Sequence, residues 1–246
     1  MRAGAEVVVA CGGDGTVSAV AGALVDTPAA LGIIPRGTAN SVAAAPRRAE
    51  RPRECVRGDR VGPRRLAAAR VAGRTMVLMA TIGLHARAVT EAAGDKAALG
   101  VLAYVTKGVE VAASGESFTA TVRADEVGAV TLRLSSLTVA NLAPPHSLLA
   151  QGPDALRPDD GKVDVTMVSF EGLIEAAVTA AHLLRSALVG EPATRENVAW
   201  FRAARVTVEA DPPQALMVDG EAVGETPFTV EARPRSLRVL VPSGEG

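Results

Sequence analysis

Two strand–turn–helix units follow one another at the start of the chain, and they restrict its fold more than any other feature. The first runs from the apolar stretch EVVVAC (6–11) through GGDGT (12–16) into a segment whose apolar residues recur at helical spacing. The second runs from LGII (31–34) through a Pro-Arg-Gly turn into TANSVAAA (38–45). Apolar strands that alternate with amphipathic helices are typical of a parallel α/β sheet, so we expect one here.

The glycine-rich turn after the first strand is a candidate phosphate site. Glycines let backbone N–H groups approach an anion, and a helix N-terminus adds partial positive charge. The candidate residues are Gly12, Gly13, Gly15 and Thr16. Asp14 does not suit phosphate directly but suits Mg²⁺ or a hydroxyl beside one, and we expect it to have no structural duty. An ordinary turn would explain the Gly-Gly-Asp-Gly sequence equally well. The sequence has neither a Walker A motif nor a G-x-G-x-x-G fingerprint, which disfavours the common nucleotide-binding folds.

The composition changes after about residue 46, where a Pro- and Arg-rich linker begins. Beyond it, short strand-like pieces are interrupted by two helical segments, at 101–112 and 172–190. Many short strands separated by turn signals predict a β-sandwich-like domain. The predicted fold class is therefore α/β. A parallel α/β part with the candidate phosphate turn, over residues 1–62, precedes a β-sandwich-like second domain with inserted helices over residues 63–246.

Charge and composition narrow the range of partners. The net charge of −1 over 246 residues gives no general attraction to nucleic acid. Residues 36–70 are an exception, because ten arginines against three acidic residues give a local charge of +7. That cluster suits either a solvated linker or a contact with anionic lipid or nucleotide phosphate. Two cysteines, no apolar run of membrane-spanning length and no signal-peptide pattern predict a cytoplasmic protein with peripheral membrane contacts.

Several motifs, taken in order, resemble the catalytic domain of bacterial diacylglycerol kinases and their lipid-kinase and sphingosine-kinase relatives. They are GGDGTVSAV (12–20), LGIIPRGTANSVA (31–43), TIGLHARAV (81–89), GVLAYVTKGVEVA (100–112), ALRPDDGKVDV (155–165) and LMVDGE (216–221). GGDGT alone also occurs in NAD kinases, whereas its combination with I-P-x-G-T-A-N and V-D-G-E is more specific. The resemblance covers almost the whole chain.

The resemblance implies an ATP-dependent kinase that phosphorylates the hydroxyl of a diacylglycerol-like or other lipid at a membrane surface, with ATP and Mg²⁺ as cofactors. The implied ATP-binding residues are Gly12, Gly13, Asp14, Gly15 and Thr16 on the first turn, and Gly37, Thr38 and Asn40 on the second. Asp14 and Glu221 are the implied catalytic residues. Asp14 would arrange Mg²⁺ or the phosphoryl group, and Glu221 would take the hydroxyl proton as general base.

A structural Mg²⁺ loop is also implied by the resemblance. Asp160, with the backbone carbonyls of Arg157 and Lys162, matches such a loop in bacterial members. Local structure alone explains this motif and the last one, because RPDDG is an ordinary turn sequence and Asp219-Gly220 is a strong hairpin signal. Glu221 and Asp160 are therefore assigned on the resemblance. A homodimer is left open.

Departures from the family pattern leave other functions open. Met1 falls just before the GGDGT strand, where the family has a further strand–turn–helix, so we expect either a misplaced start or a truncation. Ser41 replaces the aspartate of the family's P-x-G-T-x-N-D turn, and Ser18 stands where many relatives have asparagine. A weakly active or inactive remnant that binds lipid or nucleotide is therefore one alternative, and an NAD kinase-like enzyme is another.

Overall fold

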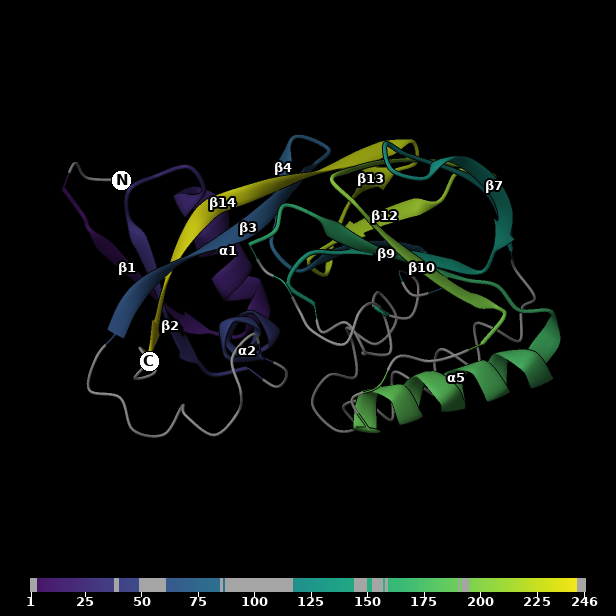
Figure 1. The fold of residues 1–246 in the computed structure, drawn as a ribbon, viewed down its shortest axis with the longest axis horizontal. Coiled ribbons are helices and arrows are strands. Elements are labelled where there is room, and N and C mark those ends of the chain that lie inside the picture. Colours follow the sequence, from purple (N-terminus) through teal and green to yellow (C-terminus); the bar gives the residue numbers. More distant parts are fainter. Residues whose placement is uncertain are drawn as a thin grey trace.

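The chain folds into two β-sheets with helices at one end and on one side (Figure 1). The computed structural model describes residues 4–37, 40–48, 61–84, 86, 117–143, 150–151, 157, 159–189, 191 and 195–242. The helix expected at 101–112 and most of the arginine-rich linker lie outside these residues. The fold is mixed α/β, as the sequence predicts.

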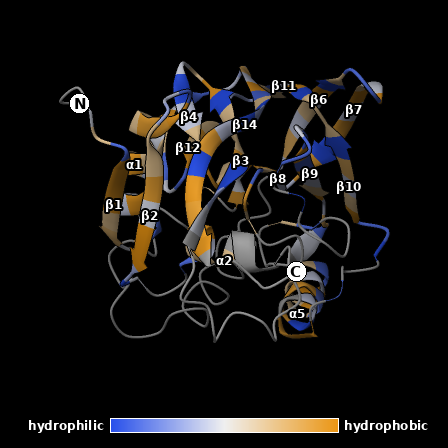
Figure 2. Cartoon of the chain, turned by 60° about the vertical axis from the view of Figure 1, so that its left-hand side comes forward, coloured by the Kyte–Doolittle hydropathy of each residue, from blue (hydrophilic) through white to orange (hydrophobic). Residues whose placement is uncertain are grey.

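The first two strand–turn–helix units form as expected. Their elements are β1 (Val7–Gly12), α1 (Asp14–Leu24), β2 (Ala30–Pro35) and α2 (Ser41–Arg48). Strands β1 and β2 pair in parallel, from Val7 opposite Ala30 to Gly12 opposite Pro35. Both strands are rich in apolar residues (Figure 2). Because their carboxyl ends lie side by side, the two turns that follow them meet at one edge of the sheet.

Strand β14 (Phe228–Pro242) joins the two halves of the molecule and crosses the view in Figure 1. Its last part pairs in parallel with β2, through Arg238 opposite Ala30. Its first part pairs with β11 (Arg205–Asp211), which belongs to the β-rich half. Strand β3 (Val61–Val71) lies along nearly all of β14, with a register shift between Arg233 and Leu237. The two halves therefore share one sheet, and the boundary at residue 62 stays a prediction.

The remaining strands complete the eight-stranded sheet and form a second, six-stranded one. The first sheet has the strand order β1-β2-β14-β11-β6-β7. In it, β6 is Phe118–Ala124 and β7 is Gly128–Leu134. Strand β3, beside β14, also pairs with β4 (Arg74–Met76). The second runs β10 (Val198–Ala203), β9 (Val163–Val168), β8 (Ser136–Ala140), β5 (Met79–Gly83), β12 (Ala215–Val218) and β13 (Glu221–Glu225).

Two apolar cores hold these layers together. The larger one fills the space between the sheets and includes Ile82, Leu137 and Val206, all fully buried. The second lies beneath α1, where Leu24 and Leu31 meet residues of later strands such as Leu237. Helix α5 (Gly172–Val189) packs through a smaller cluster against the ends of β9 and β10. The second core ties the phosphate-turn candidates to the rest of the molecule.

Candidate active site

The two glycine turns touch each other through their backbones. A Cβ atom on Gly37 would lie 2.5 Å from the Cα atom of Gly13, and one on Gly13 would lie 3.1 Å from that of Gly37. The backbone N–H of Arg36 also donates to the carbonyl of Gly12, at 2.9 Å. Only residues without a Cβ allow this approach, so close packing of the two turns requires glycine at both positions. Thr38, which the sequence assigns to the second turn, lies outside the described residues.

The N-terminus of α1 faces open space at this edge. Gly13 is the N-cap residue, and its carbonyl accepts the first helical hydrogen bond from Val17. Gly15 and Thr16 are exposed, and a Cβ atom on Gly15 would meet no described residue within 4 Å. The first N–H groups of a helix have no partners within the helix, and the helix dipole favours negative charge there. This end of α1 therefore has the chemistry of a phosphate site.

Asp14 has a structural contact that the sequence interpretation did not expect. Its Oδ1 atom accepts a hydrogen bond from the backbone N–H of Val42, at 3.0 Å. Val42 is fully buried and lies in the first turn of α2. The carboxylate therefore joins the N-termini of the two helices. The expectation that Asp14 has no structural duty is wrong, and a test of its function has to keep this bond.

Asn40 shapes the second turn from within. Its Oδ1 atom accepts the backbone N–H of Gly37 at 2.8 Å, and its Nδ2 atom donates to the Gly37 carbonyl at 2.6 Å. Its φ of 48° lies in the left-handed region, which asparagine tolerates better than most residues. The side chain thus holds the turn in place directly before α2. Ser41, which replaces the family's aspartate, is the first residue of that helix and is partly buried.

The V-D-G-E turn is a hairpin anchored by its aspartate. Asp219 and Gly220 both have positive φ, and Val218 pairs with Glu221 across the turn, as the sequence predicts. The Asp219 carboxylate accepts backbone N–H groups from residues 77, 78 and 79, at 2.8, 2.8 and 3.0 Å. Burial raises the pKa of Asp219, although these three bonds oppose the shift. The turn is therefore fixed to the segment that connects β4 and β5.

Helix α1 approaches this turn as well. Ser18 lies one helical turn after Asp14. Its hydroxyl is buried and forms no hydrogen bond with a described residue. That hydroxyl is nevertheless close enough to lower the pKa of Asp219 in part. The glycine-turn helix and the V-D-G-E hairpin are therefore neighbours in space, although about 200 residues separate them in the chain.

Glu221 itself is an exposed residue at the start of β13. Its Oε2 atom lies 3.4 Å from Nη1 of Arg74, and the two side chains are 77% and 58% exposed. An ion pair so open to water contributes little to stability. No described residue holds the Glu221 carboxylate more firmly than this, and its role as a base stays a prediction.

In the implied Mg²⁺ loop, the carboxylate of Asp160 forms an ion pair with an arginine side chain. Both carboxylate oxygens of Asp160 face the guanidinium of Arg202, and Asp160 also accepts the backbone N–H of Lys162 at 3.1 Å. Arg157 is exposed. Within the described part of the chain, no three His, Cys, Asp or Glu side chains gather as metal ligands. This arrangement around Asp160 fits a guanidinium and does not fit Mg²⁺ on the same carboxylate.

Comparison with known proteins identifies the family. Residues 79–241 match the model of the YegS C-terminal NAD kinase beta sandwich-like domain, and residues 1–59 match the diacylglycerol kinase catalytic domain. A probable YegS-like lipid kinase from Stenotrophomonas maltophilia is 32% identical over 98% of this chain and 80% of its own length. The chain belongs to the family of YegS-like lipid kinases and diacylglycerol kinases. The diacylglycerol kinase of Bacillus subtilis is 29% identical over 96% of the chain.

A longer relative and two solved structures are also similar to this chain. An uncharacterized protein from Synechocystis is 37% identical over 97% of this chain, which spans 55% of that protein. Among solved structures, a putative diacylglycerol kinase from Bacillus anthracis aligns with a TM-score of 0.70 at 19% identity, over 96% of this chain and 76% of its own. An NAD kinase from Archaeoglobus fulgidus in complex with ATP gives 0.50 at 14% identity, over 98% and 78%. These structures show the shared fold.

Proposed function

We propose that this chain is an ATP-dependent lipid kinase, which moves the γ-phosphoryl group of ATP to the hydroxyl of a diacylglycerol-like or other lipid. The observation that carries the proposal is the backbone contact of Gly13 with Gly37 beside the open N-terminus of α1. It puts the GGDGT and P-R-G-T-A-N motifs at one edge of the sheet, where a nucleotide would meet both. The lipid kinase names of the relatives support the substrate class.

The proposed roles follow the chemistry of the residues. Backbone N–H groups of Gly13 to Thr16 would hold the ATP phosphates, with Gly37 and Asn40 shaping the opposite side. Mg²⁺ carried with ATP would neutralise charge on the phosphates when bound, and Asp14 is the carboxylate that would hold it. Oδ1 of Asp14 accepts the N–H of Val42, and among the described residues no hydrogen bond occupies Oδ2, which would serve that purpose. Glu221 would accept the proton of the lipid hydroxyl.

The lipid is proposed to reach the protein at a membrane surface. Within the described residues, no helix is long and apolar enough to cross a membrane. Because the proposed substrate is a lipid, we propose peripheral contact with the inner face of the cytoplasmic membrane.

A binding protein without turnover is the second candidate. The first residue of α2 is Ser41 and not the aspartate of the family pattern. One carboxylate oxygen of Asp14 already accepts the N–H of Val42. Glu221 meets only an exposed arginine among the described residues. These observations favour a site that can hold nucleotide more readily than it can transfer a phosphoryl group.

The experiment that tests the proposal is a transfer assay on the purified chain. Labelled ATP and Mg²⁺ are incubated with a panel of hydroxyl lipids in detergent micelles, and in a separate arm with NAD⁺. Label in a lipid product supports the proposal. Label in NAD⁺ alone would reassign the chain to the NAD kinases. Saturable ATP binding without any labelled product would favour the second candidate.

A further inference from the structure

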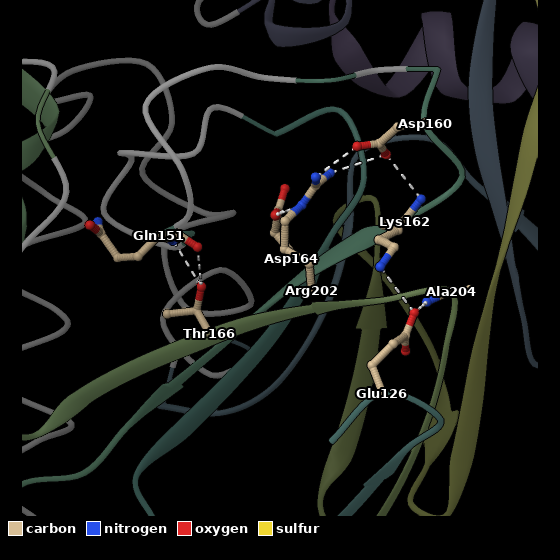
Figure 3. Close-up of polar contacts among 8 residues, drawn as sticks. All are labelled: Glu126, Gln151, Asp160, Lys162, Asp164, Thr166, Arg202 and Ala204. Atoms are coloured by element: carbon tan, nitrogen blue, oxygen red, sulfur yellow. Dashed lines mark hydrogen bonds and ion pairs between the residues drawn. The ribbon is translucent and has the colours of Figure 1, made fainter. Parts of the chain in front are cut away.

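A charged cluster lies on the β-rich half, and the proposed kinase chemistry does not use it (Figure 3). Arg202 on β10 stands directly opposite Asp164 on β9, as a cross-strand pair. Asp160 lies in the turn that leads into β9. The three side chains point toward one another, with the guanidinium between the two carboxylates.

The contacts of Arg202 are short and directional. Its Nη1 atom lies 2.7 Å from Oδ2 of Asp160, and its Nη2 atom lies 3.1 Å from Oδ1 of the same carboxylate. Its Nε atom donates to Oδ1 of Asp164 at 2.7 Å. Such two-pronged contacts match the planar fork of arginine and are the strongest ion-pair geometry that proteins use.

The cluster is substantially shielded from water. The side chains of Arg202, Asp160 and Asp164 are only 17%, 27% and 5% exposed. Burial raises the pKa of Asp164, and the charge of Arg202 opposes that shift. Burial alone would lower the pKa of Arg202, yet the hydrogen bonds and charges of the two carboxylates raise it above its ordinary value. The contact geometry therefore gives the two carboxylates one shared positive partner, Arg202.

A second ion pair extends the network along the same turn. Asp160 Oδ1 accepts the backbone N–H of Lys162, which fixes the turn from its carboxylate side. The Nζ atom of Lys162 lies 3.3 Å from Glu126, and Glu126 also accepts the backbone N–H of Ala204 at 3.2 Å. Glu126 precedes β7 and Ala204 follows β10, so the turn is tied to both sheets.

We propose that Arg202 is the resident cation of this turn and that it takes the place of the divalent ion which the family resemblance assigns to Asp160. A metal ion bound to Asp160 would lie beside the guanidinium and be repelled by it. Mg²⁺ also prefers six oxygen ligands in octahedral geometry, whereas both oxygens of Asp160 already accept from Arg202. The turn therefore keeps its shape without divalent metal.

The proposal has a consequence for a variant without the arginine. In Arg202→Gln, the carboxylates of Asp160 and Asp164 remain close together and lose their positive partner. Two carboxylates so placed are what Mg²⁺ or Mn²⁺ binds. The substitution is therefore expected to destabilise the fold and at the same time to create a dependence on divalent metal that the wild type lacks.

Thermal unfolding of the full chain tests this without ATP or lipid, so its outcome is independent of the kinase proposal. The wild-type midpoint should be the same in EDTA and in millimolar MgCl₂. Arg202→Gln should lower the midpoint in EDTA by about 5–10 °C, because the buried acids lose their partner, and MgCl₂ should restore part of the loss. Arg123→Gln is the matched control, since Arg123 pairs with Glu209 where both side chains are half exposed. It should shift the midpoint little, and equally with or without MgCl₂.

A lower wild-type midpoint in EDTA would overturn the proposal, as would an Arg202→Gln midpoint no lower than that of the control. If Arg202→Gln does not fold, Mn²⁺ binding to the wild type and to Asp160→Asn is counted by electron paramagnetic resonance. Equal numbers of bound ions support the proposal, because Asp160 then holds no metal in the wild type. One ion fewer in Asp160→Asn would refute it.

Discussion

A Cβ atom on Gly37 would stand 2.5 Å from the Cα atom of Gly13, so the two motif turns are in backbone contact. The same Cβ would also lie 3.1 Å from Oδ1 of Asn40, the atom that accepts the N–H of Gly37. Neither neighbour is the free end of a flexible side chain. The distance between the two turns therefore depends on the absence of a side chain at position 37.

Gly37→Ala should separate the two turns. We expect it to lower the free energy of unfolding by about 1–3 kcal/mol, as overpacking commonly does, and to weaken ATP binding. Gly15→Ala is the control for stability alone, because its Cβ would meet no described residue within 4 Å and alanine favours the helix by up to about 1 kcal/mol. Chemical denaturation and calorimetric titration with ATP measure both effects. A Gly37→Ala protein as stable as the wild type would show that the turns are not in contact.

Asp219 is expected to be more important for stability than for catalysis. Asp219→Ala removes the acceptor of three backbone N–H groups and should lower the free energy of unfolding by about 2–4 kcal/mol. Asp26→Ala is the matched control, since Asp26 also has positive φ and its carboxylate pairs with Arg233 on the exposed surface. The difference between the two variants in urea unfolding isolates the carboxylate contacts. Equal losses would mean that strain at positive φ is the whole effect.

Glu221, in contrast to Asp219, is expected to be more important for catalysis than for stability. Because its only described ion pair is exposed, Glu221→Gln should change the free energy of unfolding by less than about 0.5 kcal/mol. If it is the base, kcat for lipid phosphorylation should fall by about 10²- to 10⁴-fold with little change in ATP affinity. Arg74→Gln removes the same ion pair and serves as control, with kcat expected near that of the wild type. Unchanged turnover in Glu221→Gln would remove the base assignment.

Local patterns were enough to predict the elements that carry the motifs. The apolar runs gave β1 and β2, helical spacing gave α1 and α5, and the Asp219-Gly220 pair gave the hairpin between β12 and β13. Each of these signals lies within a few consecutive residues. The fold class followed from their order, because strand–turn–helix repeats and then short strands permit few arrangements.

The contacts that assemble the site could not be predicted in this way. Asp14 meets Val42, Asp219 meets the segment around Leu78, and Arg202 meets Asp160, at separations from 28 to 142 residues. Such pairs leave no periodic signal in a single sequence. Strand β10 gives no alternating signal, because the residues between its two buried ends are all exposed or half-buried. The pairing of β14 with β2 likewise depends on the whole topology.

The most direct test of the central claim compares labelled phosphoryl transfer to diacylglycerol by the wild type and by Asp14→Asn. Asparagine keeps an oxygen that can accept the Val42 N–H, so the fold should persist, and Asp14→Ala shows the cost of losing that bond as well. We predict transfer by the wild type and a rate at least about 100-fold lower in folded Asp14→Asn. Equal rates in the two proteins, or no transfer by the wild type where a known diacylglycerol kinase is active, would contradict the account.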